Sequence, residues 1–227
     1  MRAQKAFNIL NYINFCVKID NILENEVQTM IAIIDYGAGN LHSVKNALDY
    51  LGVKSIITSN SDDILSASHV ILPGVGSFGD AMRCLKDSNL IDTVKKAADG
   101  SRPFLGICLG LHLLFEESEE SPDAEGLGIY KGKVKKIPDT GLKIPHMGWN
   151  NIELSKQSRI LPDNSPYMYF VHSYYIEPQD KSLISSYTEY GKKLAVSIED
   201  NNVFAVQFHP EKSGAVGLGI LKKFSEL

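Results

Sequence analysis

Short apolar runs alternate with helix-compatible stretches from Met30 onward, and this alternation constrains the fold more than any other feature of the chain. The run IAIID (31–35) precedes a stretch in which leucine and valine recur at helical spacing up to Gly52, and the runs VKSIIT and HVILP follow. Such alternation is typical of parallel strands joined by crossover helices. The sequence therefore predicts an α/β domain with a mostly parallel central sheet.

The second half of the chain has a different pattern. PFLGI (103–107) is a continuous apolar run, as expected for a central strand buried on both faces, and the following LGLHLLFEE predicts a helix. The runs YKGKVKKI, YMYFVHSYY, LAVSIED and VFAVQF predict antiparallel or mixed strands, with a hairpin turn at 200–202 and a final helix over 215–224. We therefore expect a smaller antiparallel section beside the parallel sheet.

Composition narrows the functional classes. The 227 residues, 44% of them hydrophobic, suit one domain, and a net charge of -4 with interspersed signs argues against a nucleic-acid partner. Cys16, Cys84 and Cys108 lie far apart without C-x-x-C spacing, which argues against a disulfide framework and a zinc site. No apolar run approaches the roughly 20 residues that span a bilayer. These features predict a cytoplasmic protein that is not embedded in a membrane.

Residues 1–29 stand apart from this pattern. They lack the apolar h-region and the small-residue cleavage site of a secretory signal, and Met30 opens the first strand-like run. We expect an N-terminal extension that is disordered or that results from a translation start assigned too early. The functional domain is expected over residues 30–227.

Cys108 lies where the apolar run meets the predicted helix. Gly106-Ile107-Cys108-Leu109-Gly110 has the spacing of a nucleophile elbow, in which flanking glycines allow a sharp strand-to-helix turn. At a helix N-terminus, unpaired N–H groups and the helix dipole favour the reactive thiolate. A small buried core cysteine is the alternative, and the elbow alone does not decide between them.

A nucleophilic cysteine needs a base, and His209 is the histidine best placed for this role. It follows the apolar run VFAVQF and precedes Pro210 and Glu211. Residues two apart on an extended segment point to the same side, so Glu211 can accept a hydrogen bond from one ring nitrogen and fix the tautomer of the other. Without a partner cysteine, a surface histidine beside a solvated glutamate would be the better interpretation.

The segment Pro73-Gly74-Val75-Gly76-Ser77-Phe78-Gly79 matches the dinucleotide-binding pattern G-x-G-x-x-G by letter. That pattern belongs after the first strand of a βαβ unit, with an acidic residue about 20 positions later. Here it follows the third predicted strand. A backbone bend whose N–H groups point at a developing oxyanion is the better interpretation.

Together, PGVGSFG, GICLG and QFHPE resemble the three motifs of the class I glutamine amidotransferases, and this combination is specific although each piece alone is not. The segments DYGAGN, LFEESEE, EGLG, PHMGWN and FVHSYY resemble one branch of that family, the glutaminase subunits of imidazole glycerol phosphate synthase. The resemblance extends from Met30 to the C-terminus. It implies a three-layer, flavodoxin-like α/β fold.

The resemblance also implies roles for individual residues. Cys108 would be the nucleophile, His209 the general acid and base, and Glu211 the carboxylate that orients it. The oxyanion donors would be the N–H groups of Val75 and Leu109. The glutamine site would be lined by Gly76, His112, Glu120, Ser173 and Tyr174. His112 departs from the glutamine that many members carry at this position, so substrate contact and neutral packing both remain open.

The same resemblance implies a partner and no cofactor. Glutamine would be hydrolysed here, and the ammonia would pass to a cyclase subunit with a (β/α)₈ barrel in a heterodimer that serves histidine biosynthesis. Trp149 and Lys212 would face that cyclase, although core packing is the alternative for Trp149. No metal or organic cofactor is implied.

Three alternatives stay open at this point. The chain could feed ammonia to another synthase, such as one that amidates a surface-sugar precursor. It could be an α/β-hydrolase, although in that fold the acid usually precedes the histidine. It could also be an inactive regulatory relative, against which the intact Cys108, His209 and Glu211 argue.

Overall fold

A computed structural model describes residues 29–227, so the predicted extension lies outside the described residues apart from Thr29. The core of the fold is a sheet whose parallel part runs in the order β2, β1, β3, β4, β13. The bounds of these strands are β1 Ile31–Ile34, β2 Ser55–Thr58, β3 His69–Gly74, β4 Phe104–Cys108 and β13 Val203–Val206. The predicted parallel sheet is confirmed.

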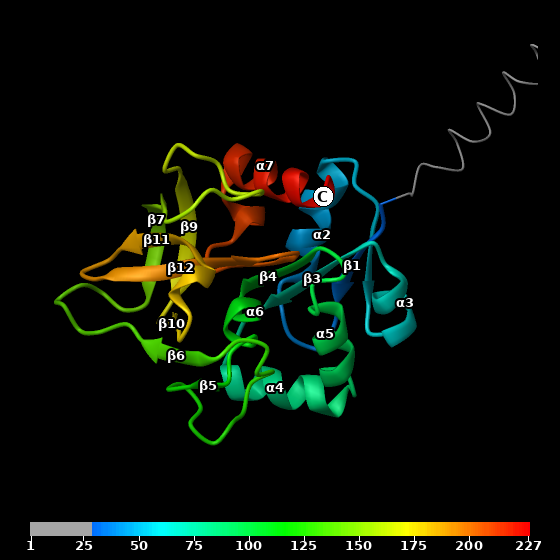
Figure 1. The fold of residues 1–227 in the computed structure, drawn as a ribbon, viewed down its shortest axis with the longest axis horizontal. Helices are drawn as coiled ribbons and strands as arrows, with labels where there is room; N and C mark the ends of the chain where they lie inside the picture. The colour runs from blue at the N-terminus through cyan, green and yellow to red at the C-terminus, as the bar shows by residue number, and fades with distance from the viewer. Residues whose placement is uncertain (1–28) are drawn as a thin grey trace, which may run out of the picture.

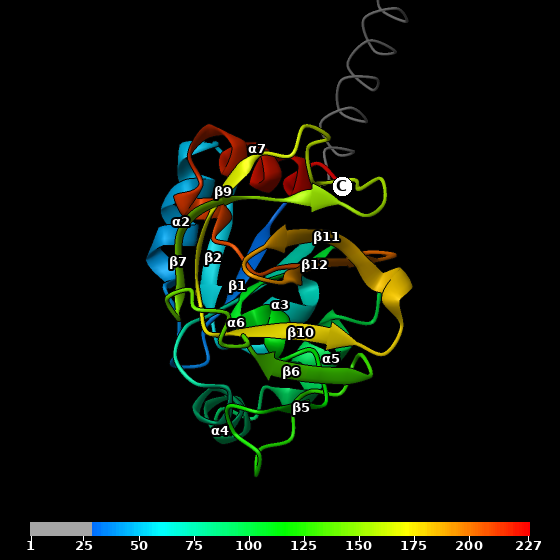
Figure 2. The ribbon, with the colours of Figure 1, turned by 90° about the vertical axis from the view of Figure 1, so that its left-hand side faces the viewer.

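An antiparallel section continues this sheet on the β13 side. The order onward is β12, β10, β6 and β5, with β11 and β8 beside β12. Figure 2 looks onto this section, in which β6, β10, β12 and β11 follow one another. Their bounds are β5 Glu117–Ser118, β6 Gly132–Lys136, β8 Glu153–Leu154, β10 Tyr174–Pro178, β11 Ile184–Glu189 and β12 Lys193–Asp200. A separate antiparallel pair is formed by β7 (His146–Asn151) and β9 (Tyr167–His172).

Helices cover both faces of the parallel sheet, which gives the three predicted layers (Figure 1). The helices α2 (Leu41–Tyr50) and α7 (Gly214–Ser225) lie on one face. The other face is covered by α3 (Ser61–Ser66), α4 (Phe78–Asp87), α5 (Ile91–Ala97) and α6 (Leu109–His112). Two short 3₁₀ turns, η1 (Lys181–Leu183) and η2 (Pro210–Lys212), complete the elements.

The side-chain alternation of the central strands divides the core in two. In β1, Ile31 and Ile33 pack into the cluster under α2 and α7, whereas Ala32 and Ile34 pack into the cluster on the opposite face. All four residues are buried, which explains why this run shows no polar alternation. Because both faces of each central strand are buried, a shift in register would misplace its side chains. The register is therefore fixed, and with it the position at which each strand ends.

Two details differ from the sequence-based expectations. The helix predicted over LGLHLLFEE ends after one turn at His112, and the carbonyl oxygens of Leu113 and Leu114 accept instead from backbone N–H groups of the segment 127–130. The run YMYFVHSYY forms two strands, β9 and β10, which belong to different sheets. The predicted turn at 200–202 and the final helix are confirmed, with Asn201 in the left-handed region at a φ of 51°.

Candidate active site

Cys108 joins β4 to α6 at the predicted sharp turn. Its φ of 55° and ψ of -109° are unusual for a residue with a side chain, and such strain persists only where the surroundings impose it. A Cβ atom on Gly110 would collide with the Leu72 carbonyl oxygen, and one on Gly106 would lie 2.9 Å from the Gly110 carbonyl oxygen. The flanking glycines therefore allow β3, β4 and α6 to approach one another around the sulfur.

The helix that follows Cys108 is shorter than the sequence predicts. α6 contains four residues, so only one turn of aligned peptide dipoles points at the sulfur. Because the macrodipole arises from aligned peptide units and unpaired terminal N–H groups, such a short helix supplies a weaker field than the predicted helix would. Stabilisation of a thiolate at this position consequently depends more on neighbouring side chains.

His209 and Glu211 form a buried pair beside the sulfur. The His209 Nδ1–H group donates to Glu211 Oε1 at 2.9 Å, and the side chains are 3% and 1% exposed. The predicted pairing is present, but its geometry is not that of an extended segment, because Glu211 lies in the 3₁₀ turn η2. His209 Nε2 is buried and has no hydrogen-bond partner within residues 29–227. This nitrogen is thus the one available for proton transfer.

The protonation of His209 depends on two opposing effects. Burial lowers its pKa, whereas the Cys108 thiolate and the Glu211 carboxylate raise it, and the result is a pKa of about 9. The imidazolium form is therefore stabilised near neutral pH when the sulfur is ionised. A thiolate beside an imidazolium is the arrangement that activates a cysteine nucleophile.

A cavity of about 340 Å³ opens beside these groups, within the size range of small-molecule sites. Every residue that the sequence predicts to bind glutamine lines it, as do Cys108 and His209 and both predicted oxyanion residues. The lining residues are Val75, Gly76, Cys108, Leu109, His112, Glu120, Pro145, Val171, His172, Ser173, Tyr174, His209 and Lys212. Segments far apart in sequence thus converge on one cavity.

The bend after β3 reaches the cavity through Val75 and Gly76. Gly76 has a φ of 98°, which glycine adopts readily and other residues do not. The next segment begins α4, where the Ser77 side chain accepts from the Asp80 N–H group and Glu120 Oε2 accepts from the Phe78 N–H group at 2.8 Å. Glu120, a predicted glutamine-binding residue, therefore also caps a helix N-terminus.

Two buried groups at the site were missed by the sequence analysis. Gln207 is completely buried, and its side chain lies between Cys108 and His112. The sign available in the sequence was a lone polar residue inside the apolar run VFAVQF. His172, inside FVHSYY, lines the cavity and accepts a hydrogen bond at Nε2 from His146 Nδ1 at 2.9 Å.

The tautomers of the two paired histidines follow from their partners. The His172 Nδ1–H group donates to the Tyr174 carbonyl oxygen, so His172 Nε2 must accept from His146. Burial lowers the pKa of His146 to about 4 and that of His172 to about 3. His112 is likewise neutral, because burial lowers its pKa to about 4 against the raising effect of the Gln207 contact.

Acid should destabilise the protein through these neutral rings. A histidine held neutral takes up its proton on unfolding, so stability falls as pH drops below about 6.5 toward the folded-state pKa, by about 2 kcal/mol at pH 5 for a ring such as His112. Urea unfolding at pH 7 and pH 5 measures this loss. It should be smaller in His112→Gln and unchanged in the exposed-site control His42→Gln. An equal loss in His112→Gln and wild type would contradict the assignment.

Comparison with known proteins shows which family the chain belongs to. The family model described as glutamine amidotransferase class-I matches residues 32–225, and the chain belongs to this family. The chain is similar to proteins named imidazole glycerol phosphate synthase subunit HisH. It is 50% identical to the Methanocaldococcus jannaschii protein over 87% of this chain and 100% of the relative. It is 48% identical to the Moorella thermoacetica protein over 87% of this chain and 94% of the relative.

Solved structures show the same fold at low sequence identity. A structure titled "Structure of PurLQS from Thermotoga maritima" aligns with a TM-score of 0.69 and 18% identity over 88% of this chain and 99% of that one. Another, titled "Crystal structure of glutamine amidotransferase", has a TM-score of 0.67 and 19% identity, with 86% and 97% covered. The predicted class I amidotransferase-like α/β fold is thereby confirmed.

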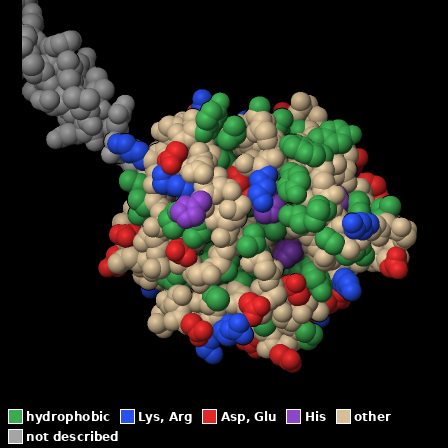
Figure 3. Space-filling view, turned by 180° about the vertical axis from the view of Figure 1, so that it is seen from behind, with side chains coloured by type: hydrophobic (Ala, Val, Ile, Leu, Met, Phe, Trp, Pro, Cys, Tyr) green, Lys and Arg blue, Asp and Glu red, His purple; other side chains and the backbone are tan. Residues whose placement is uncertain are grey.

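The described residues were also compared with the requirements of a metal site and of a membrane-spanning helix. Among residues 29–227, no three His, Cys, Asp or Glu side chains are grouped so that they could hold a metal ion. No helix in this part of the chain combines the length and apolar character that a bilayer crossing requires. On the face shown in Figure 3, acidic and basic side chains are interspersed among hydrophobic ones.

Proposed function

We propose that this chain hydrolyses glutamine to glutamate and ammonia through a thioester on Cys108. The observation that carries the proposal is that Cys108 and His209, the latter paired with the buried Glu211, line the same cavity as all the predicted glutamine-binding residues. The sulfur attacks the side-chain amide carbon, and His209 Nε2–H protonates the departing amine, which leaves as ammonia. Water, deprotonated by His209, then attacks the thioester and releases glutamate.

The remaining cavity residues have roles that fit this chemistry. The N–H groups of Val75 and Leu109 stabilise the oxyanion of each tetrahedral intermediate. Gly76, His112, Glu120, Ser173 and Tyr174 surround the substrate, with the Glu120 carboxylate suited to its ammonium group. The free thiol that this mechanism needs is kept reduced in the cytoplasm, where we place the enzyme.

The named relatives motivate a partner for the ammonia. Each is a subunit of imidazole glycerol phosphate synthase. In our proposal this chain forms a heterodimer with a cyclase subunit built as a (β/α)₈ barrel. The cyclase uses the ammonia to make imidazole glycerol phosphate and an aminoimidazole carboxamide ribotide in histidine biosynthesis, while this chain supplies only the hydrolysis.

The outer face of the β7–β9 pair is suited to dock such a partner. Met147 pairs with Val171 and Trp149 pairs with Tyr169 across the two strands, and Met147 and Trp149 are 62% and 56% exposed. The indole of Trp149 contacts Tyr169 edge to face at a centroid distance of 6.2 Å, so the exposed ring is held in place. The exposure of Trp149 supports this role over the core-packing alternative.

This face of the β7–β9 pair is adjacent to the cavity. Lys212 Nζ lies 6.0 Å from the centre of the Tyr169 ring, and Lys212 and Val171 also line the cavity. A partner seated on this face would therefore close the cavity mouth. Ammonia formed at Cys108 could then enter the partner without release to solvent.

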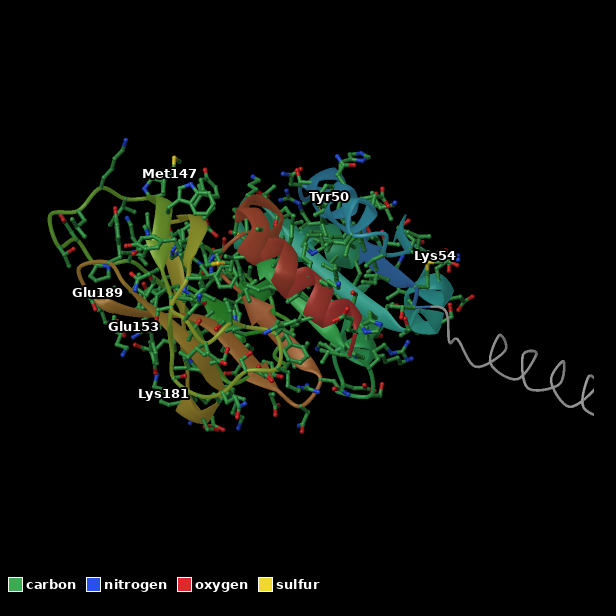
Figure 4. All side chains as sticks on the ribbon, turned by 90° about the horizontal axis from the view of Figure 1, so that it is seen from above. Tyr50, Lys54, Met147, Glu153, Lys181 and Glu189 are labelled. Atoms are coloured by element: carbon green, nitrogen blue, oxygen red, sulfur yellow. The ribbon has the colours of Figure 1, made fainter. Side chains whose placement is uncertain are left out.

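Removal of the central aromatic anchor should weaken the complex. Trp149→Ala is expected to raise the cyclase Kd by one to two orders of magnitude, because buried tryptophans at interface centres contribute about 2 kcal/mol or more. Tyr50→Ala is the matched control, because Tyr50 is 80% exposed on α2, well separated from Met147 in Figure 4. Calorimetric titration measures both. Equal Kd values for Trp149→Ala and wild type would place the interface elsewhere.

The function is tested by glutaminase rates in three conditions: the chain alone, with the cyclase, and with the cyclase and its nucleotide ligand. We expect a low glutaminase rate for the chain alone and a rate about 10²–10³ times higher with the cyclase and its ligand. The reason is that the peptide at Val75 in the Gly-Val-Gly bend can rotate and bring its N–H group to the oxyanion, and one such donor changes the rate by about this factor. Equal rates in all conditions would refute the switch. Activation only by the synthase of a surface-sugar pathway would identify a different partner.

A further inference from the structure

Gln207 contacts the nucleophile directly, although the mechanism above gives it no role. Its side-chain amide is completely buried, and Nε2 lies 3.8 Å from Cys108 Sγ, which is within reach of an N–H···S hydrogen bond. Gln207 follows the end of β13, which pairs in parallel with β4. Gln207 and Cys108 therefore lie side by side at the carboxyl ends of these two strands. The contact thus lies directly after the paired ends of two central strands.

The other end of the same amide is fixed by His112. His112 Nε2 lies 2.6 Å from Gln207 Oε1, and both groups are buried. An amide oxygen only accepts hydrogen bonds, so the neutral imidazole must carry its proton on Nε2 and donate it. The opposite amide orientation would place the Gln207 Oε1 lone pairs against the sulfur, which disfavours a thiolate. The chain of donors therefore runs from His112 through Gln207 to Cys108.

The sulfur has a particular need for such a donor. The helix α6 that begins after it has a single turn, so its dipole gives limited support to a negative charge. The sulfur is also nearly enclosed, with Cys108 8% exposed, so bulk water solvates a thiolate poorly. A fixed N–H group aimed at the sulfur compensates for the missing water without any reorganisation during the reaction.

We infer that Gln207 donates a hydrogen bond to the Cys108 thiolate and stabilises it, and that His112 is the positioning residue that orients the Gln207 amide. The inference rests on the proposed role of Cys108 as nucleophile and adds a thiolate donor to it. The inference also gives a function to His112, which stands where many family members carry glutamine: its Nε2–H group holds the Gln207 amide. His112 is thus tied to the nucleophile rather than only packed beside it.

Several other titratable groups lie near the Cys108 sulfur and also affect its ionisation. His209 and Glu211 stand on the β13 and η2 side, and the buried Tyr36 hydroxyl lies under the elbow beside Gly74. Glu120 and Lys212 reach the cavity from other elements. Because Gln207 carries no charge, its replacement leaves all of these charges in place.

The test is the pH dependence of Cys108 alkylation by iodoacetamide in the full chain. The alkylated peptide is quantified by mass spectrometry, so that Cys16 and Cys84 do not interfere. Loss of a donor to the charged form raises the pKa of the thiol. In Gln207→Met, which keeps the side-chain length without a donor, the midpoint should move up by about one pH unit, and alkylation below the midpoint should slow about tenfold.

Three further variants make the result specific. His112→Leu, which removes the positioning donor, should shift the midpoint in the same direction. His112→Gln, which can still donate to Gln207 Oε1, should restore it toward the wild-type value. Gln157→Met makes the same chemical change at an exposed position and should leave it unchanged. Circular dichroism and thermal melting establish that each variant is folded.

The outcomes separate this inference from the proposed function, because alkylation needs neither glutamine nor the cyclase. A wild-type midpoint in folded Gln207→Met would overturn the donor role. A normal midpoint in folded His112→Leu, with a shift in Gln207→Met, would overturn the positioning role of His112 alone. Shifts as expected in a protein that does not hydrolyse glutamine would support the donor and refute the function.

Discussion

Cys108→Ala should abolish glutamine-dependent product formation by the assembled complex and leave ammonia-dependent formation intact. The thioester requires a nucleophile at the elbow, and the other cysteine in the described residues, Cys84, does not line the cavity. The alanine side chain is smaller and apolar, and the elbow glycines still allow the turn, so the fold should persist. The measurement compares product formation from glutamine and from an ammonium salt at saturating nucleotide.

Cys84→Ala is the matched control for this experiment, because it removes a partly buried thiol on α4 and should retain both activities. Glutamine-dependent turnover by Cys108→Ala above the background of a protein-free reaction would remove Cys108 from the mechanism. Loss of the ammonia-dependent reaction as well would show that the substitution disrupted the complex instead.

His209→Asn should reduce the glutaminase rate by roughly 10²–10⁴, and by more than Glu211→Gln does. In the proposed mechanism His209 transfers a proton in both halves of the reaction through Nε2, which has no hydrogen-bond partner among residues 29–227. Glu211 acts on the opposite nitrogen, where it holds the ring and helps to raise its pKa. A glutamine at position 211 can still accept from Nδ1–H through its side-chain oxygen, so orientation survives while the charge is lost.

The order of these two effects is measured with saturating glutamine and the cyclase complex present. The pH profile adds a second readout. Without the Glu211 charge the His209 pKa should fall, so the decline of activity at alkaline pH should begin at lower pH in Glu211→Gln. A larger loss in Glu211→Gln than in His209→Asn would show that the carboxylate does more than orient the ring.

Much of the fold could be predicted because burial leaves a local record in the sequence. The run 31–35 is apolar throughout because β1 is covered on both faces, and the glycines around Cys108 are required by contacts with Leu72 and with Gly110 itself. The residues that we propose for catalysis could be selected from the sequence, because each lies in a short motif at or just after the end of a strand. The structure confirms that these motifs converge on one cavity.

What could not be predicted depends on long-range pairing. α6 has a single turn, and the backbone carbonyls that follow it bond to the segment 127–130 and not to the next helical turn, a competition that no local signal marks. The contact of His112 with Gln207 joins residues 95 positions apart, and that of His146 with His172 joins residues 26 apart. Propensity and periodicity describe one element at a time, so they do not reveal which side chains two elements will bring together.

In the proposed complex this chain produces the ammonia that its partner consumes. This transfer is tested most directly by measuring glutamate and imidazole glycerol phosphate together, in a complex of this chain with the cyclase supplied with glutamine and nucleotide but no ammonium salt. We expect the two products to form in equal amounts and both rates to vanish when this chain is omitted. Product formation without glutamate, or glutamate without any coupling to product, would contradict it.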